Sequence, residues 1–557
     1  MENSHPMFTT HTDTLERALT AIAERAYWSA YPESPSPRVY GEHAAADGEA
    51  AFRAYLGNDF PLKDQPAITD WVATESSPFG IPLDVRYPHL DVDGLLAAAA
   101  AGMPAWRDAG PQTRAGVCVE ILARLHANAF ELANAVHATT GQAFVMAFQA
   151  GAPHAFDRAL EAIAYAYREM ARTPATATWE KPAGKGDPLR MSKTFHIVPR
   201  GIALVIGCNT FPTWNSFPGL FASLATGNPV VVKPHPGAVL PLAITVKIAR
   251  EVLADAGFDP NLVLLAPEAP GEGLAKVLAL RPEVRIIDFT GSTEFGDWLE
   301  DNARQAAVYT EKAGVNTIVV DSTDDFAGMC RNIGFSLLLY SGQMCTTPQN
   351  VLVPEGGIAT EDGHRSFDDV AAGIAGAVAA LTRDPAKGVE LSGAIVNDGV
   401  LRRLEKARTL GTVVLESSDV THPVFQNATV RTPLIVRLDA DASATYGTEW
   451  FGPISFVVAT DSTVGSLRIF ADTVGKKGAL TASVYSTSAD VLDAMEEAAL
   501  QASVHLSVNL TGGVFVNQSA AFSDFHASGA NPAANAALTD GAYVASRFRV
   551  VQSRRHV

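Results

Sequence analysis

Cysteine is scarce in this chain of 557 residues, which has only Cys118, Cys208, Cys330 and Cys345. Four cysteines are too few for a disulfide framework, and their spacing fits no common metal-binding pattern. No run of about 18 apolar residues occurs, and the segment Met1 to Thr12 lacks the basic and apolar regions of a secretion signal. The sequence therefore predicts no metal site, no membrane span, no export and a cytoplasmic location.

Positive charge is also in short supply. The chain has 42 lysines and arginines against 60 aspartates and glutamates, which gives a formal net charge of −18. A field of this sign repels the phosphate backbone of nucleic acids and anionic membrane surfaces. We therefore expect no nucleic-acid partner and no membrane partner. A local basic pocket for a phosphorylated ligand remains open, because net charge does not describe single clefts.

Hydrophobic residues are abundant, at 47% of the chain, so the composition is that of a globular protein of about two to four domains. The first 180 residues are largely helical in pattern. β-rich runs separated by helix-length segments then follow in two sets, and this alternation predicts two parallel sheets in an α/β fold, joined near residues 311–316. The runs are Ile202 to Ile206, Pro229 to Val232, Leu262 to Leu265 and Val284 to Phe289, then Thr317 to Val320, Val351 to Val353, Ala394 to Val396 and Ile454 to Val458.

Two short strand-like segments lie outside these sets. Leu189 to Val198 and Phe548 to Val551 are both flanked by charged residues. A strand with charge on both sides is typical of an exposed position. We expect the two segments to pair as an arm that stands away from the main body.

Cys345 is the thiol in the most reactive setting. It lies among small and polar residues, directly after the apolar run Ile333 to Tyr340. A nucleophilic cysteine needs an approach path and surroundings that favour the thiolate, whereas a packing cysteine lies within a hydrophobic stretch. A buried, inert thiol is the alternative for Cys345. Cys208, beside Asn209, could line the same site without reacting.

Three further motifs are weak when taken singly. Glu311, in a turn of small residues, could activate water, or could be a surface carboxylate. Lys233 follows a strand and could hold a ribose or a phosphate, or could be a solvated lysine. Gly291 and Ser292 join a strand to a helix, where backbone N–H groups could face a pyrophosphate, although plain turns have the same pattern.

Taken together and in order, the motifs resemble the aldehyde dehydrogenase superfamily. The matching segments are Lys233-Pro234, Gly291-Ser292-Thr293, Glu311-x-x-Gly314, Gly342-Gln343-x-Cys345 and Glu449-x-Phe451-Gly452-Pro453. The resemblance implies a Rossmann-like NAD(P)-binding domain over residues 1–310, interrupted by arm strands at about 185–199, and a catalytic domain over 311–530. It also implies a C-terminal arm over 531–557 that serves oligomerisation, in a homodimer or a homotetramer.

The same resemblance implies roles for single residues. Cys345 would be the nucleophile that carries the acyl group, and Glu311 would activate the water that releases it. Glu449 and Phe451 would hold the nicotinamide ribose and ring. The family places an asparagine in the oxyanion hole, and Thr210 occupies that place when the sequences are aligned without a gap. A local shift would bring Asn209 into the hole instead, and we favour Asn209.

Cofactor choice and substrate also follow from the resemblance. Pro236 stands where NAD-preferring members often carry a glutamate, so NADP is at least as plausible as NAD. Tyr27-Trp28-Ser29, Phe211 to Asn215 and Asn509 to Ser519 resemble PaaN-type phenylacetic acid degradation proteins. That likeness implies a small-molecule aldehyde, a CoA-linked semialdehyde from ring cleavage, as substrate. The alternatives are a CoA-acylating dehydrogenase, in which a glutamate like Glu311 is generally missing, and a non-catalytic cofactor-binding subunit.

Overall fold

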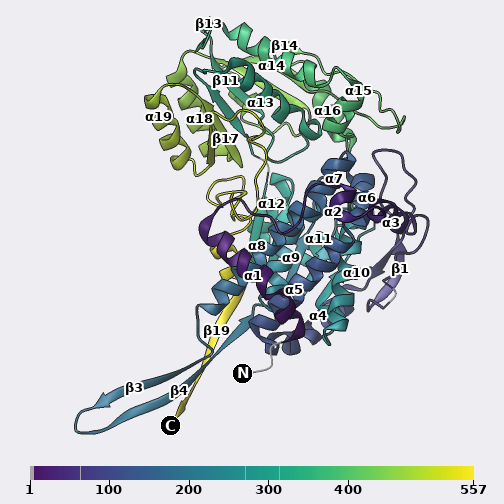
Figure 1. Ribbon diagram of the computed structural model, residues 1–557, viewed down its shortest axis with the longest axis vertical. Coiled ribbons are helices and arrows are strands. Elements are labelled where there is room, and N and C mark those ends of the chain that lie inside the picture. The colour runs from purple at the N-terminus through teal and green to yellow at the C-terminus, as the bar shows by residue number, and fades with distance from the viewer. Residues whose placement is uncertain (1–4, 63, 270, 313) are drawn as a thin grey trace.

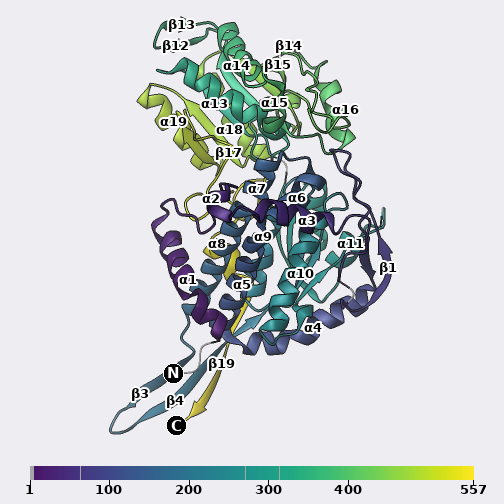
Figure 2. The same ribbon diagram turned by 45° about the vertical axis from the view of Figure 1, so that its right-hand side comes forward.

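The computed structural model describes residues 5–62, 64–269, 271–312 and 314–557, so the first four residues of the polar N-terminal segment lie outside it. Two mainly parallel sheets, each with helices on both faces, follow one another along the long axis of the molecule (Figure 1). A three-stranded arm extends from the lower end (Figure 2). The predicted α/β fold with two doubly wound sheets and a small β arm is confirmed.

The first sheet is entirely parallel, with the order β7-β6-β5-β8-β9. Alternate residues of its strands face two separate cores, as the pleat of a strand requires: Ala203 and Val205 enter one, Leu204 and Ile206 the other. Helices α9 and α10 cover the first face, and α4, α11 and α12 the second. The bounds are β5 (Ile202–Ile206), β6 (Val230–Lys233), β7 (Val263–Leu265), β8 (Val284–Thr290), β9 (Ala307–Glu311), α4 (Val92–Asp108), α9 (Pro212–Ala225), α10 (Leu240–Asp255), η1 (Pro260–Leu262), α11 (Leu274–Ala279) and α12 (Thr293–Asn302).

The remaining N-terminal elements form a helical layer packed around α9 and α10. The predicted pattern that ends near Gly141 is divided at Asn128 into α5 and α6, while the prediction for residues 155–171 falls within α8. The bounds are α1 (Pro6–Glu24), α2 (Pro37–Tyr40), α3 (Ala44–Arg53), β1 (Ile68–Val72), β2 (Tyr87–Leu90), α5 (Gly110–Ala127), α6 (Ala129–Thr140), α7 (Phe144–Gly151) and α8 (Pro153–Ala171).

The second sheet has the order β14-β15-β16-β11-β10-β17-β18, and β14 is its antiparallel edge strand. Val319 of β10 faces the core under α18 and α19, while Ile318 and Val320 face α13 and α14. The bounds are β10 (Thr317–Val320), α13 (Phe326–Leu338), η2 (Leu339–Gly342), β11 (Asn350–Pro354), β12 (Ile358–Thr360), β13 (Gly363–Arg365), α14 (Phe367–Leu381), α15 (Pro385–Ser392), α16 (Asp398–Ala407), β14 (Thr412–Leu415), β15 (Leu434–Asp439), α17 (Ser443–Tyr446), β16 (Ile454–Thr460), α18 (Thr463–Lys477), β17 (Thr481–Tyr485), α19 (Ala489–Gln501), β18 (His505–Val508) and α20 (Gly541–Ala545).

One predicted strand of the second set is wrong. Ala394 to Val396 is buried or nearly so but has no regular secondary structure. Its backbone N–H groups donate to groups from three different segments: Ala394 to Gly141 O, and Val396 to the side chain of Gln343. The apolar pattern reflects burial between loops, because a short apolar run alone cannot distinguish a strand from a buried loop.

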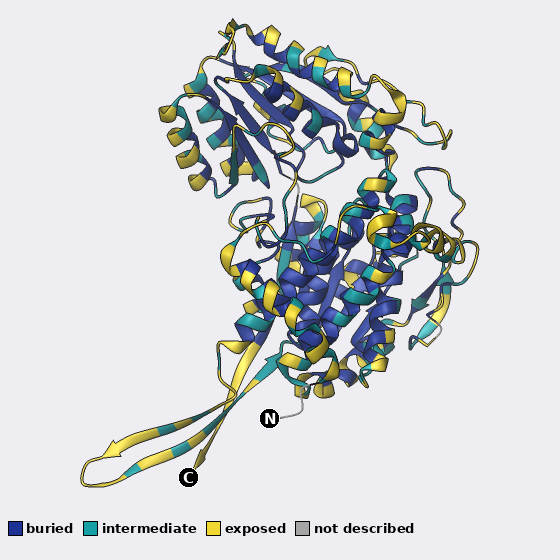
Figure 3. Ribbon diagram, in the orientation of Figure 1, coloured by how far each residue is buried: buried dark blue, intermediate teal, exposed yellow. Residues whose placement is uncertain are grey.

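The arm contains three strands, β3 (Thr176–Ala183), β4 (Gly186–Pro199) and β19 (Phe548–His556), in the order β19-β4-β3. The predicted pairing of its two segments is confirmed, since Phe548 pairs with Pro199 and His556 with Met191. The sequence reasoning missed β3. Most arm residues are exposed, in contrast to the buried sheets (Figure 3).

Among the described residues, no helix combines the length and the apolar character that crossing a membrane requires.

Candidate active site

The carboxyl ends of all five strands of the first sheet meet at one edge, because the strands run parallel. Asn209 comes shortly after β5, Lys233 ends β6 and Glu268 follows β7. Gly291 follows β8, and Glu311 ends β9. Residues from widely separated parts of the chain therefore gather at the place where parallel sheets bind their ligands.

A cavity of about 650 Å³ opens at this edge, between the two sheets. Every residue that the sequence predicted for the site lines it: Asn209, Lys233, Gly291, Ser292, Glu311, Cys345, Glu449 and Phe451. Cys208, Thr210 and Pro236 line it as well. The structure thus brings all of these residues together, although their individual roles remain predictions.

The loop before Cys345 has an unusual backbone. Tyr340, Ser341 and Gly342 have φ angles of 53°, 50° and 64°, all in the left-handed region. A side chain at Gly342 would place its Cβ 2.2 Å from the carbonyl oxygen of Gly452. Only glycine allows so close an approach. The nucleophile loop is therefore pressed against the segment that carries Glu449.

Buried amides hold this loop in place. Gln343 Nε2 donates to Ala394 O at 3.0 Å, and its Oε1 accepts from Val396 N at 3.0 Å. Asn316 Nδ2 donates to the backbone carbonyl of Cys345 at 2.7 Å. Because buried amides with several partners restrict motion, the position of the Cys345 backbone is well defined.

The thiol and the carboxylate at this end of the cavity oppose one another. Cys345 is partly accessible to the cavity but closely surrounded, and burial together with the Glu311 carboxylate raises its pKa well above the ordinary value. Burial also opposes ionisation of Glu311, which is only 4% exposed, but the charge and hydrogen bond of His526 outweigh it and lower the pKa of that carboxyl. A neutral thiol beside an ionised carboxylate results.

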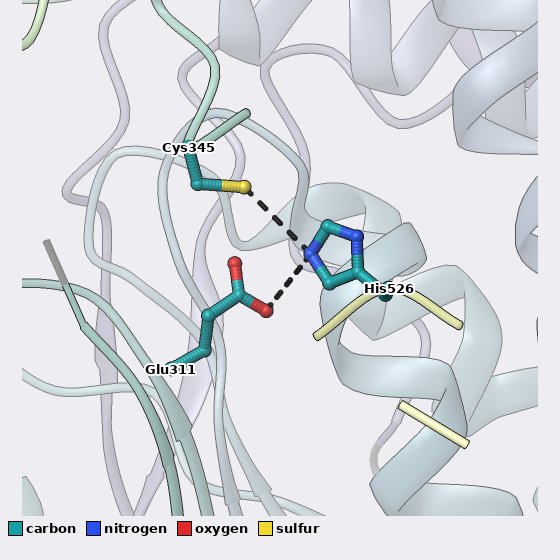
Figure 4. A group of neighbouring side chains, drawn as sticks. All are labelled: Glu311, Cys345 and His526. Carbon is teal, nitrogen blue, oxygen red and sulfur yellow. Dashed lines mark hydrogen bonds and ion pairs between the residues drawn. The ribbon is translucent and has the colours of Figure 1, made fainter. Parts of the chain in front are cut away.

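His526 is a member of the site that the sequence reasoning missed. Its Nε2 lies 3.2 Å from Glu311 Oε2 and 3.9 Å from Cys345 Sγ (Figure 4). The ligand atoms of these three side chains lie within 4.8 Å of one another, and such residue types can bind zinc. The absence of a metal site therefore stays a prediction. No pattern around His526 in the sequence indicates a function.

Two amides lie near the place where an oxyanion would form. Asn209 lines the cavity, and its Oδ1 has no hydrogen-bond partner among the described residues. Asn215, on α9, donates from Nδ2 to Glu311 Oε2 at 3.3 Å, while its Oδ1 faces Cys208 Sγ at 3.6 Å. The sequence reasoning gave Asn215 no role. Its amide is engaged with Glu311, so Asn209 keeps the freer polar side chain.

The other end of the cavity carries fixed charges. Lys233 is buried, which lowers its pKa, and its Nζ donates to Glu268 Oε1 at 2.6 Å. Ser292 caps α12 by accepting from Phe295 N at 3.3 Å. A Cβ at Gly291 would lie 2.6 Å from the ring of Phe289, so a side chain there would have to displace that ring. A helix N-terminus with a bare backbone suits a phosphate, and the Lys233–Glu268 pair suits ribose hydroxyls.

Glu449 completes the polar lining. Burial raises its pKa to about 7, and Arg403 opposes that shift. A carboxyl in this state accepts hydrogen bonds from hydroxyl groups without requiring a cation of its own. The polar groups along the cavity therefore fit a nicotinamide dinucleotide, either NAD or NADP.

The comparisons with known proteins agree with this geometry. A solved NAD-dependent aldehyde dehydrogenase from Burkholderia multivorans is 62% identical over 100% of this chain and 99% of its own, with a TM-score of 0.98. N-succinylglutamate 5-semialdehyde dehydrogenase of Chromobacterium violaceum is 25% identical over 465 residues, 82% of this chain and 85% of the relative. A Thermus 1-pyrroline-5-carboxylate dehydrogenase with bound NAD is 21% identical over 96% of this chain and 99% of its own, with a TM-score of 0.72, and shares the fold.

A sequence profile described as "Aldehyde dehydrogenase family" matches residues 86–541. This range includes both sheets and every residue of the candidate site. The enzyme class predicted from the motifs is confirmed, because the chain belongs to the aldehyde dehydrogenase family.

Proposed function

We propose that this enzyme oxidises an aldehyde to its carboxylic acid through a thioester on Cys345, with NAD as the preferred cofactor. One observation carries the proposal: Cys345 and Glu311 share a cavity with Lys233, Gly291 and Glu449. A nucleophile, a base and a dinucleotide site are the parts that this reaction requires.

The chemistry divides into two halves. In the first, Cys345 Sγ attacks the carbonyl carbon, and a C–S bond forms as the oxygen gains negative charge. A bound nicotinamide supplies the hydride acceptor, and the substrate becomes a thioester. In the second half, Glu311 removes a proton from water, the water oxygen attacks the acyl carbon, and the C–S bond breaks to release the acid.

The remaining residues bind and orient. Lys233 and Glu268 would hold the adenosine ribose, and the N-terminus of α12 at Gly291 and Ser292 would face the phosphates. Glu449 and Phe451 would hold the nicotinamide end. Their place on the far side of the cavity from Lys233 is expected from the family resemblance.

The oxyanion that forms on the substrate also needs donors. Asn209 Nδ2 and the backbone N–H of Cys345 would fill this role. Asn209 lines the cavity and has the freer amide, since Asn215 donates to Glu311. Thr210 would give weaker donation from its hydroxyl.

The preference for NAD rests on Glu268. Pro236 removes one carboxylate from the ribose end, but the structure supplies another, with Glu268 Oε1 2.6 Å from Lys233 Nζ. A carboxylate there accepts hydrogen bonds from ribose hydroxyls and repels the 2′-phosphate of NADP. The Burkholderia multivorans structure, 62% identical to this chain, is of an NAD-dependent enzyme, which agrees.

We further propose a CoA-linked semialdehyde from phenylacetate ring cleavage as the substrate. The support is the resemblance of Tyr27-Trp28-Ser29 and Asn509 to Ser519 to PaaN-type proteins. A relative that oxidises a semialdehyde, the Chromobacterium violaceum enzyme, is in line with this substrate class. Hydrolysis to a free acid is favoured over acyl transfer to CoA, because Glu311 is held ionised beside the nucleophile.

A kinetic screen tests these proposals. Free and CoA-linked semialdehydes would be offered with NAD or with NADP, in the presence and absence of free CoA. We expect the highest kcat/KM with a CoA-linked semialdehyde and NAD, and a free acid as product without added CoA. A strict requirement for CoA would instead show an acylating dehydrogenase, and no cofactor reduction with any aldehyde would show a non-catalytic subunit.

The domain limits and the assembly are part of the proposal. The cofactor domain would comprise residues 1–310 and the catalytic domain 311–530, with the arm serving a homodimer or homotetramer in the cytoplasm. The exposed strands β3, β4 and β19 support that role, because an isolated three-stranded arm leaves its polar edges and one face open for a second copy.

A further inference from the structure

Cys345 must lose its thiol proton before it can attack a carbonyl carbon, since the thiolate is the nucleophile. Burial and the neighbouring Glu311 carboxylate raise the pKa of this thiol well above the ordinary value, and Cys208 and Glu449 act in the same direction. The resting site therefore holds a neutral thiol. It needs a base within reach that can take the proton when a substrate arrives.

His526 offers one nitrogen to both reacting groups. Its Nε2 lies 3.9 Å from Cys345 Sγ and 3.2 Å from Glu311 Oε2. The side chain is 3% exposed, and its ring packs edge-on against Trp214 with the centroids 4.5 Å apart. Figure 4 shows the thiol and the carboxylate converging on this nitrogen. The packing thus fixes the imidazole in an orientation from which Nε2 can accept a proton.

We propose that His526 is the base that removes the proton from Cys345, with Glu311 stabilising the imidazolium that forms. This assignment rests on the proposed function. In the step, the S–H bond breaks, an N–H bond forms at Nε2, and the electron pair stays on Sγ. When the thioester is later cleaved, the same proton returns to Sγ as the C–S bond breaks, so His526 ends the turnover unchanged.

Glu311 alone would serve less well as that base. If it accepted the thiol proton, it would be neutral when the deacylating water needs a base. With His526 in this role, Glu311 remains ionised for the second half of the reaction. A cysteine, a histidine and an acid in contact are also the arrangement by which other enzymes activate a nucleophile.

The surroundings of His526 contain few other charges. Arg158 lies behind Trp214, with its guanidinium carbon 5.5 Å from the ring centroid. Asp524 lies in the same loop but is exposed, and its backbone carbonyl accepts from Arg158. Glu311 and Cys345 are therefore the titratable groups in direct contact with Nε2 among the described residues.

The test measures how fast iodoacetamide alkylates Cys345 in the full-length enzyme, from about pH 6 to about pH 10, by mass spectrometry of the Cys345 peptide. We expect His526→Asn and His526→Gln to react at least about tenfold more slowly than the wild type near neutral pH, and to approach the wild-type rate at high pH. His505→Asn is the matched control, because His505 packs on neighbouring Phe525 but does not line the cavity. It should react as the wild type does.

Each outcome decides the assignment. A wild-type alkylation rate in both His526 variants at every pH overturns it. If the variants lose NAD binding and so prove misfolded, the wild-type profile decides, since a rate that rises only at high pH contradicts an internal base. Activity lost with EDTA and restored by Zn²⁺ would show a metal site instead. Failure of the proposed function differs, because the wild type would then reduce no NAD although Cys345 is alkylated rapidly.

Discussion

The two ends of the cavity differ in how their charges are balanced. At the cofactor end, Lys233 is paired with Glu268 at 2.6 Å, and the charges stay where they are. At the reacting end, a thiol with a raised pKa faces a carboxylate with a lowered one, and His526 lies between them. The first arrangement binds, whereas the second is suited to proton transfer. Substitutions at the reacting end should therefore change kcat, and those at the cofactor end should change KM.

The largest effect is expected from Cys345→Ser. A serine hydroxyl in this setting does not ionise, so kcat for aldehyde oxidation should fall by about 10⁴-fold or more. NAD binding, measured by fluorescence quenching, should stay near the wild-type value. Aldehyde oxidation at a near wild-type rate in Cys345→Ser would remove the covalent mechanism.

Glu311→Gln should lower steady-state turnover by about 10²–10⁴-fold, because the amide cannot remove a proton from water. The thioester should still form, so that rapid mixing with NAD and aldehyde gives one burst of NADH per site. Mass spectrometry should detect the acyl group on Cys345. Unchanged turnover together with a trapped thioester would exclude Glu311 as the deacylating base.

Asn209→Ala tests the oxyanion donor. Loss of one donor should lower kcat by about 10²–10³-fold with little change in the KM for NAD. Asn215→Ala is the comparison, since its amide donates to Glu311 at 3.3 Å and should mainly slow deacylation. A burst of NADH that stays fast in Asn209→Ala but slows in Asn215→Ala would reassign the donor to Asn215.

Glu449 predicts a pH dependence at the cofactor end. Its pKa is raised to about 7, so the carboxyl is ionised above that pH and protonated below it. Because a carboxylate is the stronger acceptor for ribose hydroxyls, the KM for NAD should rise by up to about tenfold as the pH falls through 7. In Glu449→Gln the KM should be high throughout and almost independent of pH. A wild-type KM that is flat from pH about 6 to about 8 would count against this role.

The smallest effect is expected from Glu268→Gln. Removal of its charge should raise kcat/KM for NADP relative to NAD by about five- to tenfold, since repulsion of the 2′-phosphate near a surface is worth about 1 kcal/mol or slightly more. Glu272→Gln is a suitable control, because Glu272 pairs with His89 outside the cavity. An unchanged preference in Glu268→Gln would leave the choice of cofactor to other residues.

Much of the fold could be predicted because local patterns decided it. The strands Ile202–Ile206 and Val284–Thr290 are apolar and buried on both faces, and their sequences show this directly. The pairing of Phe548 with Pro199 in the arm was also predictable from two isolated charged strands. Residues 394–396 were predicted wrongly, because burial among loops gives the same apolar pattern as a buried strand.

The sequence by itself determined the elements, the family and the residues that follow each strand, since these depend on local pattern and spacing. Lys233, Gly291 and Glu311 each stand at the carboxyl end of a strand, and parallel pairing then gathers them at one edge. Only the tertiary structure decided that His526 and Glu268 belong to the site. Each is a single side chain without a motif, and its function depends on a contact of 3.2 Å or less with a residue distant in the chain. Such a contact exists only once the chain has folded, because no local interaction specifies it.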